Sequence, residues 1–260
     1  MKRSTSRRAL PAVLALLAGL SAAFLLDPRS RLHAQGGGRG QQAPLAPRAA
    51  AAIDLTGNWV SVVTEDWRFR MVTPPRGNYG GVPLTAEGRR IADAWDAAKD
   101  AAAGEQCKAY GAAGLMRMPG RLRIAWENDT TLRVEADAGT QTRLFHFGAS
   151  RPAGAAPAWQ GHSVAQWEYA PAARGRPRTG NLKVVTTGMR PGYLRRNGVP
   201  YSSNAVLTEH YDLITAPDGG KWLVALTEVA DPQYLTQPFV TTTHFKREPD
   251  GSKWNPTPCE

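Results

Sequence analysis

Short runs in which apolar and polar residues alternate dominate residues 59–246. Successive side chains of a β-strand point to opposite faces, so this alternation predicts strands with one face in a core. Turn residues such as END at 127–129 and PDGG at 217–220 separate neighbouring runs, as is typical of hairpins. Strands are expected at 59–64, 67–72, 121–127, 131–136, 142–147, 163–169, 182–187, 205–214, 221–229 and 241–246.

Strands joined in this way leave sheet edges exposed unless the sheet closes on itself. We therefore expect an all-β domain, an antiparallel meander β-barrel of about 8–10 strands. The segment LTAEGRRIADAWDAAK interrupts the pattern and predicts one short helix, with Thr85 as N-cap and Ile91 and Trp95 on one face. Gly88 argues against a long helix. We expect this helix to form a lid or plug at one end of the barrel.

The beginning of the chain has the pattern of a secretory signal. A basic segment, MKRSTSRR, precedes the apolar run Ala9–Leu26 and a cleavage-like RLHAQ, which predicts a signal peptide at 1–34. The alternative is an uncleaved anchor, which would make the membrane a partner. Residues 35–52, rich in Gly, Gln, Ala and Pro, predict a disordered spacer. Residues 53–260 then form a single exported domain, periplasmic or secreted.

The formal net charge of +10 invites a nucleic-acid interpretation. Eight of the basic residues, but only one acidic residue, lie within positions 1–52, so the body carries a net charge of only +3. No basic stripe interleaved with aromatic residues occurs in the body. Nucleic acid is therefore excluded as an expected partner.

The chain contains two cysteines, Cys107 and Cys259. In an exported protein an even number of cysteines favours a disulfide, which would tie the C-terminal tail to the early body. The alternative is two free buried thiols. Neither cysteine lies in a C-x-x-C motif, so redox catalysis and a cysteine zinc site are poorly supported.

The motif DLTGNWV resembles the Gly-x-Trp opening of lipocalins and related calycin barrels. The resemblance implies that Trp59 closes the bottom of a barrel, beneath its lumen. Other motifs over 54–259 resemble a broad set of exported bacterial proteins of unestablished activity: PLTAEGRR, WQGHSVAQWE, VLTEHY and DPQYLTQPF. Where that pattern has His-Ser-Glu, this chain has YSSNA, so Tyr201 replaces the histidine or its role is absent. The resemblance implies a lipocalin-like barrel and no particular reaction.

The strand WQGHSVAQWE contains the first candidate site residues, His162 and Glu168. They share one strand face, but they lie about 20 Å apart at a rise of roughly 3.3 Å per residue, too far apart to act as a catalytic pair. If the opposite face, with Trp167, points into the lumen, both side chains are merely solvated. If their own face does, His162 can meet groups from neighbouring strands.

Glu209 is the sharper candidate, because it shares a strand face with apolar neighbours and Tyr211. A buried carboxylate is costly unless it is paired or hydrogen-bonded. One interpretation is a structural ion pair with an inward arginine, Arg143 or Arg68. The other is a carboxylate with a raised pKa at the lumen, acting as acid or base or anchoring a ligand.

Further residues have weaker signals. His146 lies between two phenylalanines and Asp231 begins an Asp-Pro turn, although Asp231 could also lie at a barrel mouth. No metal site and no cofactor is expected, since the histidines lack metal-ligand spacing. The full set of expected ligand-binding residues is Trp59, Arg143, His146, Trp167, Glu168, Tyr201, Tyr211 and Asp231, with Glu209 and His162 as the catalytic candidates.

Three functional hypotheses follow. The leading one is an exported barrel that binds a small, largely apolar ligand in its lumen. The second is a cofactor-independent enzyme in the same barrel, an isomerase, cyclase or hydrolase with Glu209 or His162 as acid or base. The third is an envelope protein with a filled lumen and a structural role. The enzyme requires ionisable groups that converge at a cavity, the binder requires only the cavity, and the structural protein requires neither.

Overall fold

A computed structural model of the chain describes residues 44–171 and 179–260. The predicted signal peptide and the first part of the predicted spacer lie outside these ranges. Residues 44–51 of the spacer lie against the barrel, where Trp167 Nε1 donates to Pro47 O at 2.8 Å and Arg48 N donates to Asp129 O at 3.1 Å. The compact unit begins at Pro44.

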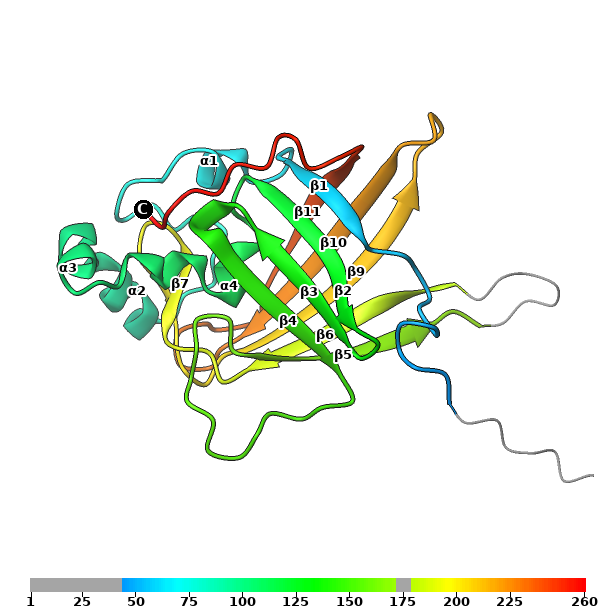
Figure 1. Cartoon of the computed structure of the whole chain (residues 1–260). Helices are drawn as coiled ribbons and strands as arrows, with labels where there is room; N and C mark the ends of the chain where they lie inside the picture. The colour runs from blue at the N-terminus through cyan, green and yellow to red at the C-terminus, as the bar shows by residue number, and fades with distance from the viewer. Residues whose placement is uncertain (1–43, 172–178) are drawn as a thin grey trace, which may run out of the picture. The chain divides into compact units, whose positions relative to one another are not determined.

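Nine strands form a closed β-barrel (Figure 1), which confirms the predicted fold class. Around the barrel their order is β1, β11, β10, β9, β6, β5, β4, β3 and β2, which pairs again with β1. Their bounds are β1 (Gly57–Val62), β2 (Arg121–Asn128), β3 (Thr131–Ala136), β4 (Gln141–Phe147), β5 (His162–Tyr169), β6 (Gly180–Thr187), β9 (Val206–Thr215), β10 (Lys221–Ala230) and β11 (Phe239–Glu248). Nine of the ten expected strand positions therefore carry a barrel strand.

The barrel departs from an antiparallel meander in two places. β4 and β5 pair in parallel, because the long connection at 148–161 returns the chain to the end of the barrel where β4 began. Between β6 and β9 the chain leaves the barrel and forms a separate antiparallel pair, β7 (Gly192–Arg195) and β8 (Val199–Tyr201). Hydrophobic alternation predicts strands but not their partners, so neither departure is encoded in it.

The strand expected at 67–72 is wrong: this segment contains the short helix α1 (Trp67–Arg70). The chain turns at Asp66, whose φ of 52° is left-handed, and Asp66 O then accepts from Phe69 N and Arg70 N. This turn directs Arg70 inward, where its Nε donates to Arg117 O at 2.9 Å. An alternating run of six residues fits a strand and a single turn of helix equally well.

The predicted helix at 84–99 is two helices, α2 (Ala86–Asp93) and α3 (Ala97–Ala102). Thr85 caps the first as expected, because its side chain accepts from Gly88 N at 3.0 Å. Asp96 caps the second and so divides the segment. A Cβ at Gly88 would lie 2.5 Å from Tyr234 O, so this glycine allows α2 to approach the loop before β11 closely.

The non-barrel elements gather at one end of the barrel, as Figure 1 shows. We call this group the cap: it comprises α1, α2, α3, the 3-10 helix η1 (Gln106–Tyr110), α4 (Ala112–Leu115), β7 and β8. Tyr201 and Val199 of β8 pack with Leu207 and Val229 from the barrel strands in one buried cluster. The predicted plug at one end of the barrel thus exists, but it contains much more than one helix.

Inward-facing side chains fill the barrel interior. Trp59, Phe145, Tyr211 and Phe245 belong to one buried cluster, together with Leu115 from the cap. Trp59 is fully buried, donates from Nε1 to Leu55 O at 3.0 Å and lies 5.6 Å beneath the guanidinium of Arg247. Trp59 is therefore a core residue of the barrel.

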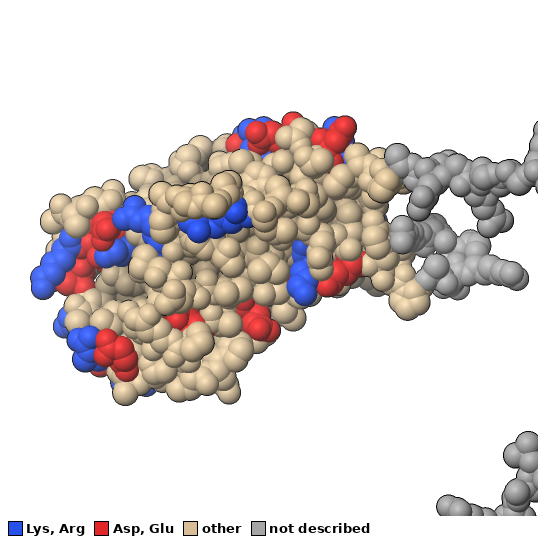
Figure 2. All heavy atoms as spheres, turned by 90° about the horizontal axis from the view of Figure 1, so that it is seen from below, with Lys and Arg blue, Asp and Glu red and all other residues tan. Residues whose placement is uncertain are grey.

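The surface of the described residues carries charge of both signs. Figure 2 shows small groups of basic and acidic side chains beside one another on one face, with wide uncharged areas between them. Within residues 44–171 and 179–260, every helix is too short or too polar to span a bilayer.

Candidate functional site

The inward face of β5 is its aromatic face. Ser163 and Ala165 are buried and Trp167 packs against the barrel cluster. His162 and Glu168 therefore lie on the outward face. The alternative in which His162 meets groups near Glu209 inside the barrel is wrong, because the pleat of β5 directs the imidazole away from the interior.

Glu209 forms the buried ion pair that was one of its two interpretations. Arg143 donates from Nη1 to Oε1 at 2.8 Å and from Nη2 to Oε2 at 2.5 Å, and both side chains are fully buried. Arg68, the other expected partner, is exposed on α1. The two-point contact matches the planar guanidinium to the carboxylate and neutralises both charges within the barrel.

Other barrel side chains complete the environment of this pair. Tyr211 OH donates to Glu209 Oε1 at 2.9 Å, and Arg143 Nη2 donates to Thr186 Oγ1 at 3.2 Å. Thr186 in turn lies 2.7 Å from Ser163 Oγ. Within the described ranges only Nε of Arg143 has no partner in this network.

The buried partners of Glu209 have shifted pKa values. Burial alone would lower the pKa of Arg143, but the electrostatic interactions with Glu209 and Tyr211 and the hydrogen bonds to them together outweigh burial and raise it. Burial and the adjacent Glu209 carboxylate both raise the pKa of the Tyr211 phenol, so that this group stays neutral and donates its hydrogen bond. The arrangement has the properties of a structural element that fixes β4, β6 and β9 together.

The two outward histidines form a stack. The rings of His146 on β4 and His162 on β5 lie 5.0 Å apart at an interplanar angle of 11°. Burial and the neighbouring His162 lower the pKa of His146. Glu168 lies further along the same outward face, 3.2 Å from His210 Nδ1 and 3.7 Å from Lys183 Nζ. None of these contacts adjoins the buried ion pair.

Tyr201 and Asp231 both lie in the cap region rather than in a lumen. Tyr201 is fully buried, its hydroxyl has no hydrogen-bond partner among the described residues, and burial raises its pKa. Asp231 accepts from Ser202 N at 2.6 Å and from Ser202 Oγ at 2.8 Å. Asp231 therefore joins the end of β10 to the residue after β8, consistent with the Asp-Pro turn expected there.

Aromatic side chains line the end of the barrel opposite the cap. Trp126, Phe147 and Trp167 pack with ring centroids 5.4–6.5 Å apart. A hollow of about 320 Å³ lies beside Phe147 and Trp167. The polar group of Trp167 is already bound to Pro47 O, and the Tyr169 hydroxyl donates to Ala50 O at 2.8 Å. These rings anchor the segment before β1.

The cap contains a cavity of about 340 Å³ between α3, η1 and β7. Its apolar wall consists of the side chains of Trp95 and Tyr193 and of several alanines, including Ala98 and Ala101 of α3. Asp100, Glu105, Arg196 and Glu260 also line it. Neither Glu209 nor Arg143 is among the described residues that line this cavity.

A charged network holds one wall of this cap cavity. Asp100 accepts from Tyr193 OH at 2.7 Å and from Lys108 Nζ at 2.7 Å. Lys108 also lies 2.5 Å from Glu105, which contacts Arg190 at 3.1 Å. Burial by itself would lower the pKa of Lys108, but its hydrogen bonds to Asp100 and Glu105 raise it. Burial and the bond to Asp100 raise the pKa of Tyr193, so that its phenol is neutral at ordinary pH.

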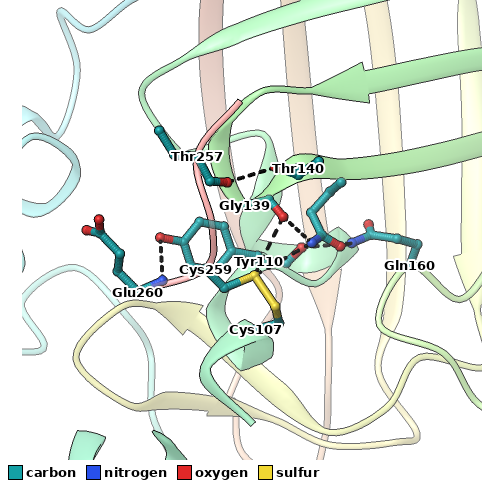
Figure 3. The surroundings of a disulfide bond; sticks show 9 residues. Cys107, Tyr110, Gly139, Thr140, Gln160, Thr257, Cys259 and Glu260 are labelled. Carbon is teal, nitrogen blue, oxygen red and sulfur yellow. Dashed lines mark hydrogen bonds between the residues drawn. A yellow bond between two sulfur atoms is a disulfide. The ribbon is translucent and has the colours of Figure 1, made fainter. Parts of the chain in front are cut away.

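The predicted disulfide joins Cys107 of η1 to Cys259 in the tail, with the Cα atoms 5.1 Å apart. Figure 3 shows the tail held beside it: Thr140 Oγ1 donates to Thr257 O at 2.9 Å, and Glu260 N donates to Tyr110 OH at 3.3 Å. Because η1 forms part of the cavity wall, the disulfide fixes the C-terminal residues at the edge of the cap cavity.

Comparisons with known proteins give no further guide to the site. No protein-family model matches this chain, and no curated protein and no solved structure matches it at a significant level. The lipocalin-like interpretation therefore rests on the closed barrel itself and on the position of Trp59. In the two described ranges, no three histidine, cysteine or carboxylate side chains lie close enough together to hold a metal ion.

Sequence reasoning missed the cap cavity. Trp95 was expected on one face of a single helix with Ile91, whereas it lies in the break between α2 and α3. Tyr193 lies in β7, a strand whose four residues are too short to give an alternating pattern. The sequence contained one other sign of this region: Asp100, Glu105 and Lys108 lie close to Cys107 along the chain. Such a cluster indicates a folded segment but does not predict a cavity.

Proposed function

We propose that this chain is an exported barrel protein that binds a small, largely apolar ligand in the cap cavity rather than in the barrel lumen. The observation that carries this proposal is the cavity of about 340 Å³ between α3, η1 and β7. Pockets for small molecules have volumes of roughly 300–1,000 Å³ and combine an apolar lining with a few polar groups. The cap cavity has both properties.

The lining supports a ligand with an apolar body and one polar end. Trp95 and Tyr193 offer aromatic surface, and the alanines leave space beside α3. The polar groups of Tyr193 and Asp100 are bound to each other and to Lys108. Arg196 lines the same cavity and forms no ion pair with any described residue, so that its guanidinium is available to an acceptor on the ligand.

Export is supported by the signal pattern at 1–34 and by the disulfide. A disulfide persists in an oxidising compartment such as the periplasm or the extracellular space. Here the disulfide fixes the edge of the cap cavity. The proposed binding site therefore depends on an oxidising compartment that keeps this disulfide formed.

The contacts of Glu209 and His162 favour a binder over an enzyme. Glu209 is held by Arg143 and Tyr211, and His162 faces outward on β5. A general acid or base must reach a bound substrate within hydrogen-bond distance. The side chains packed around Glu209 favour the cap cavity over the lumen as the ligand site in this proposal.

A fluorescent probe tests the proposal. N-phenyl-1-naphthylamine, a small apolar amine, is titrated into the wild type and into the variants Ala101→Trp and Ala102→Trp. Both alanines are exposed on α3, but only Ala101 lines the cavity. We expect the indole of Ala101→Trp to fill the space and weaken binding at least tenfold, whereas Ala102→Trp binds as the wild type does. Equal binding by all three proteins would contradict the proposal.

A further inference from the structure

Three arginines from different parts of the cap lie buried around a second, much smaller cavity. Arg70 ends α1, Arg117 follows α4 and Arg195 ends β7, and they are only 2 %, 5 % and 3 % exposed. The cavity has space for about 10 Å³, enough for one water-sized group. Met118 also lines it, as does Arg196, which is shared with the cap cavity.

The hydrogen bonds of these arginines are incomplete. Arg70 donates from Nε to Arg117 O at 2.9 Å and from Nη1 to Glu65. Arg117 donates from Nη2 to Asp66 at 3.0 Å, and Arg195 donates from Nη1 to Gly80 O at 2.8 Å. One buried nitrogen of each remains without a partner in the described part of the chain: Arg70 Nη2, Arg117 Nη1 and Arg195 Nε.

The charges are also unbalanced. Only two of the three guanidinium groups contact a carboxylate: Arg70 pairs with Glu65 and Arg117 with Asp66. Glu65 is also shared with His244, whose Nδ1 lies 3.0 Å away. Among the described residues Arg195 contacts no carboxylate. Its guanidinium lies 4.0 Å over the ring of Phe69, which offsets only part of the cost of a buried charge.

The pKa values follow from this imbalance. Burial lowers the pKa of Arg195 to about 10, and the charge of Arg117 lowers it further. Burial also lowers the pKa of Arg70. A negative group in the cavity would relieve both effects, because an opposite charge favours the ionised form.

We propose that this arginine cavity accepts one oxygen of a carboxylate group, with the free nitrogens of Arg70, Arg117 and Arg195 as its hydrogen-bond donors. Guanidinium groups match the planar geometry of carboxylates. Hydrogen bonds between an arginine and a carboxylate are charge-assisted and therefore stronger than hydrogen bonds between neutral groups. The space of about 10 Å³ holds one ligand oxygen, and it is too small for a whole phosphate or sulfate ion. The carboxylate belongs either to a small free acid or to a larger ligand whose remaining part lies outside, beside Arg196.

The first test is a thermal titration of the full chain with formate, at constant ionic strength maintained with chloride. We expect a saturable rise in Tm of about 3–6 °C at tenfold excess over the Kd, absent with chloride and weaker with phosphate. Acetate and longer acids separate the two sources: a free small acid predicts that formate and acetate bind best, and a larger ligand predicts tighter binding of longer acids. No difference between formate and chloride would show that the cavity holds only water, and would overturn the proposal, as would a response to phosphate alone.

Variants test whether the response comes from this cavity. Arg195→Met should abolish the formate response. The control variant Arg68→Met, at an exposed arginine on α1, should retain it.

Met118→Glu supplies a carboxylate within the cavity, and we expect this variant to fold and to show no response to formate. The control Met116→Glu places the same charge in the barrel cluster and should unfold the protein. A formate response retained in Arg195→Met would contradict the assignment. The cap-cavity variant Ala101→Trp should respond to formate normally, which keeps this test separate from the proposed function.

Discussion

Arg143 in the barrel and Arg195 in the cap are both buried, but their charges are handled differently. Arg143 has a two-point partner in Glu209, and Tyr211 completes the group. Arg195 contacts a backbone carbonyl and an aromatic ring, and no carboxylate among the described residues. A buried charge that is matched internally stabilises the scaffold, and the unmatched charge of Arg195 is the basis of the carboxylate site proposed above.

The barrel and the cap also differ in how tightly their side chains pack. Packed side chains form the barrel cluster, whereas the cavity of about 340 Å³ proposed as the binding site lies in the cap. The barrel thus provides a rigid support, and the irregular segments placed on its end provide the proposed binding surfaces. This division is common in β-barrels, where loops on a stable scaffold carry the function.

The largest expected effect is on the barrel pair. Glu209→Gln leaves Arg143 charged and buried, and we expect it to lower the free energy of unfolding by about 3–5 kcal/mol. The double variant Arg143→Met/Glu209→Leu removes both charges and should recover most of that loss. Urea unfolding measures both. A loss below about 1 kcal/mol in Glu209→Gln would show that the pair is not the structural element described here.

The matched change in the cap sharpens the comparison. Arg195→Met leaves no carboxylate unpaired, so we expect it to cost less than Glu209→Gln in the same urea measurement. An equal or greater loss would mean that Arg195 is as firmly integrated as Arg143, and the contrast between the two regions would fail.

Removing the disulfide should weaken the cap selectively. Cys107 and Cys259 are 152 residues apart, and closing a loop of this length stabilises a protein by about 2–5 kcal/mol. We expect Cys107→Ser/Cys259→Ser to lose stability in this range. Hydrogen exchange should show faster exchange in η1 and the tail, with β4, β6 and β9 protected as before. Faster exchange throughout the barrel would contradict a selective effect.

The smallest expected changes in the free energy of unfolding come from two tyrosine-to-phenylalanine variants, which serve as controls for each other. Tyr211→Phe removes the hydrogen bond to Glu209 and should cost about 1–2 kcal/mol. Tyr201→Phe removes a hydroxyl without a described partner, and we expect little change at neutral pH.

The pH dependence of stability gives a further test of Tyr201. Burial raises the pKa of Tyr201 above its ordinary value of 10.0, so the folded protein retains a proton that the unfolded chain loses. Stability therefore falls as pH rises above about 10, and Tyr201→Phe should flatten this decline. Urea unfolding between neutral pH and this alkaline limb measures the difference. An unchanged alkaline decline would contradict the role of Tyr201.

The barrel was predictable because its strands are long enough to alternate. β9 and β10 show the pattern clearly, and the same pattern placed Glu209 on an inward face with Arg143 as a possible partner. Export and the parity of the cysteines predicted the disulfide. Which face of β5 points inward was left open, because alternation defines two faces without choosing between them.

The cap was not predictable because its elements are short and its contacts are distant in sequence. α1 and β7 have four residues each, too few for a period, so 67–72 was misread as a strand. The arginine cavity joins Arg70, Arg117 and Arg195 from three separate segments, which no local pattern connects. Such convergence requires the folded structure.

The most direct test of the central claim is native mass spectrometry of the full chain purified from cells that export it. Four proteins are compared: the wild type, Ala101→Trp, Ala102→Trp and the barrel double variant Arg143→Met/Glu209→Leu. If the cap is the binding region, a copurified small molecule is present in the wild type, in Ala102→Trp and in the barrel variant, and is lost in Ala101→Trp. A molecule retained in Ala101→Trp but lost in the barrel variant would place the site in the lumen and contradict this account.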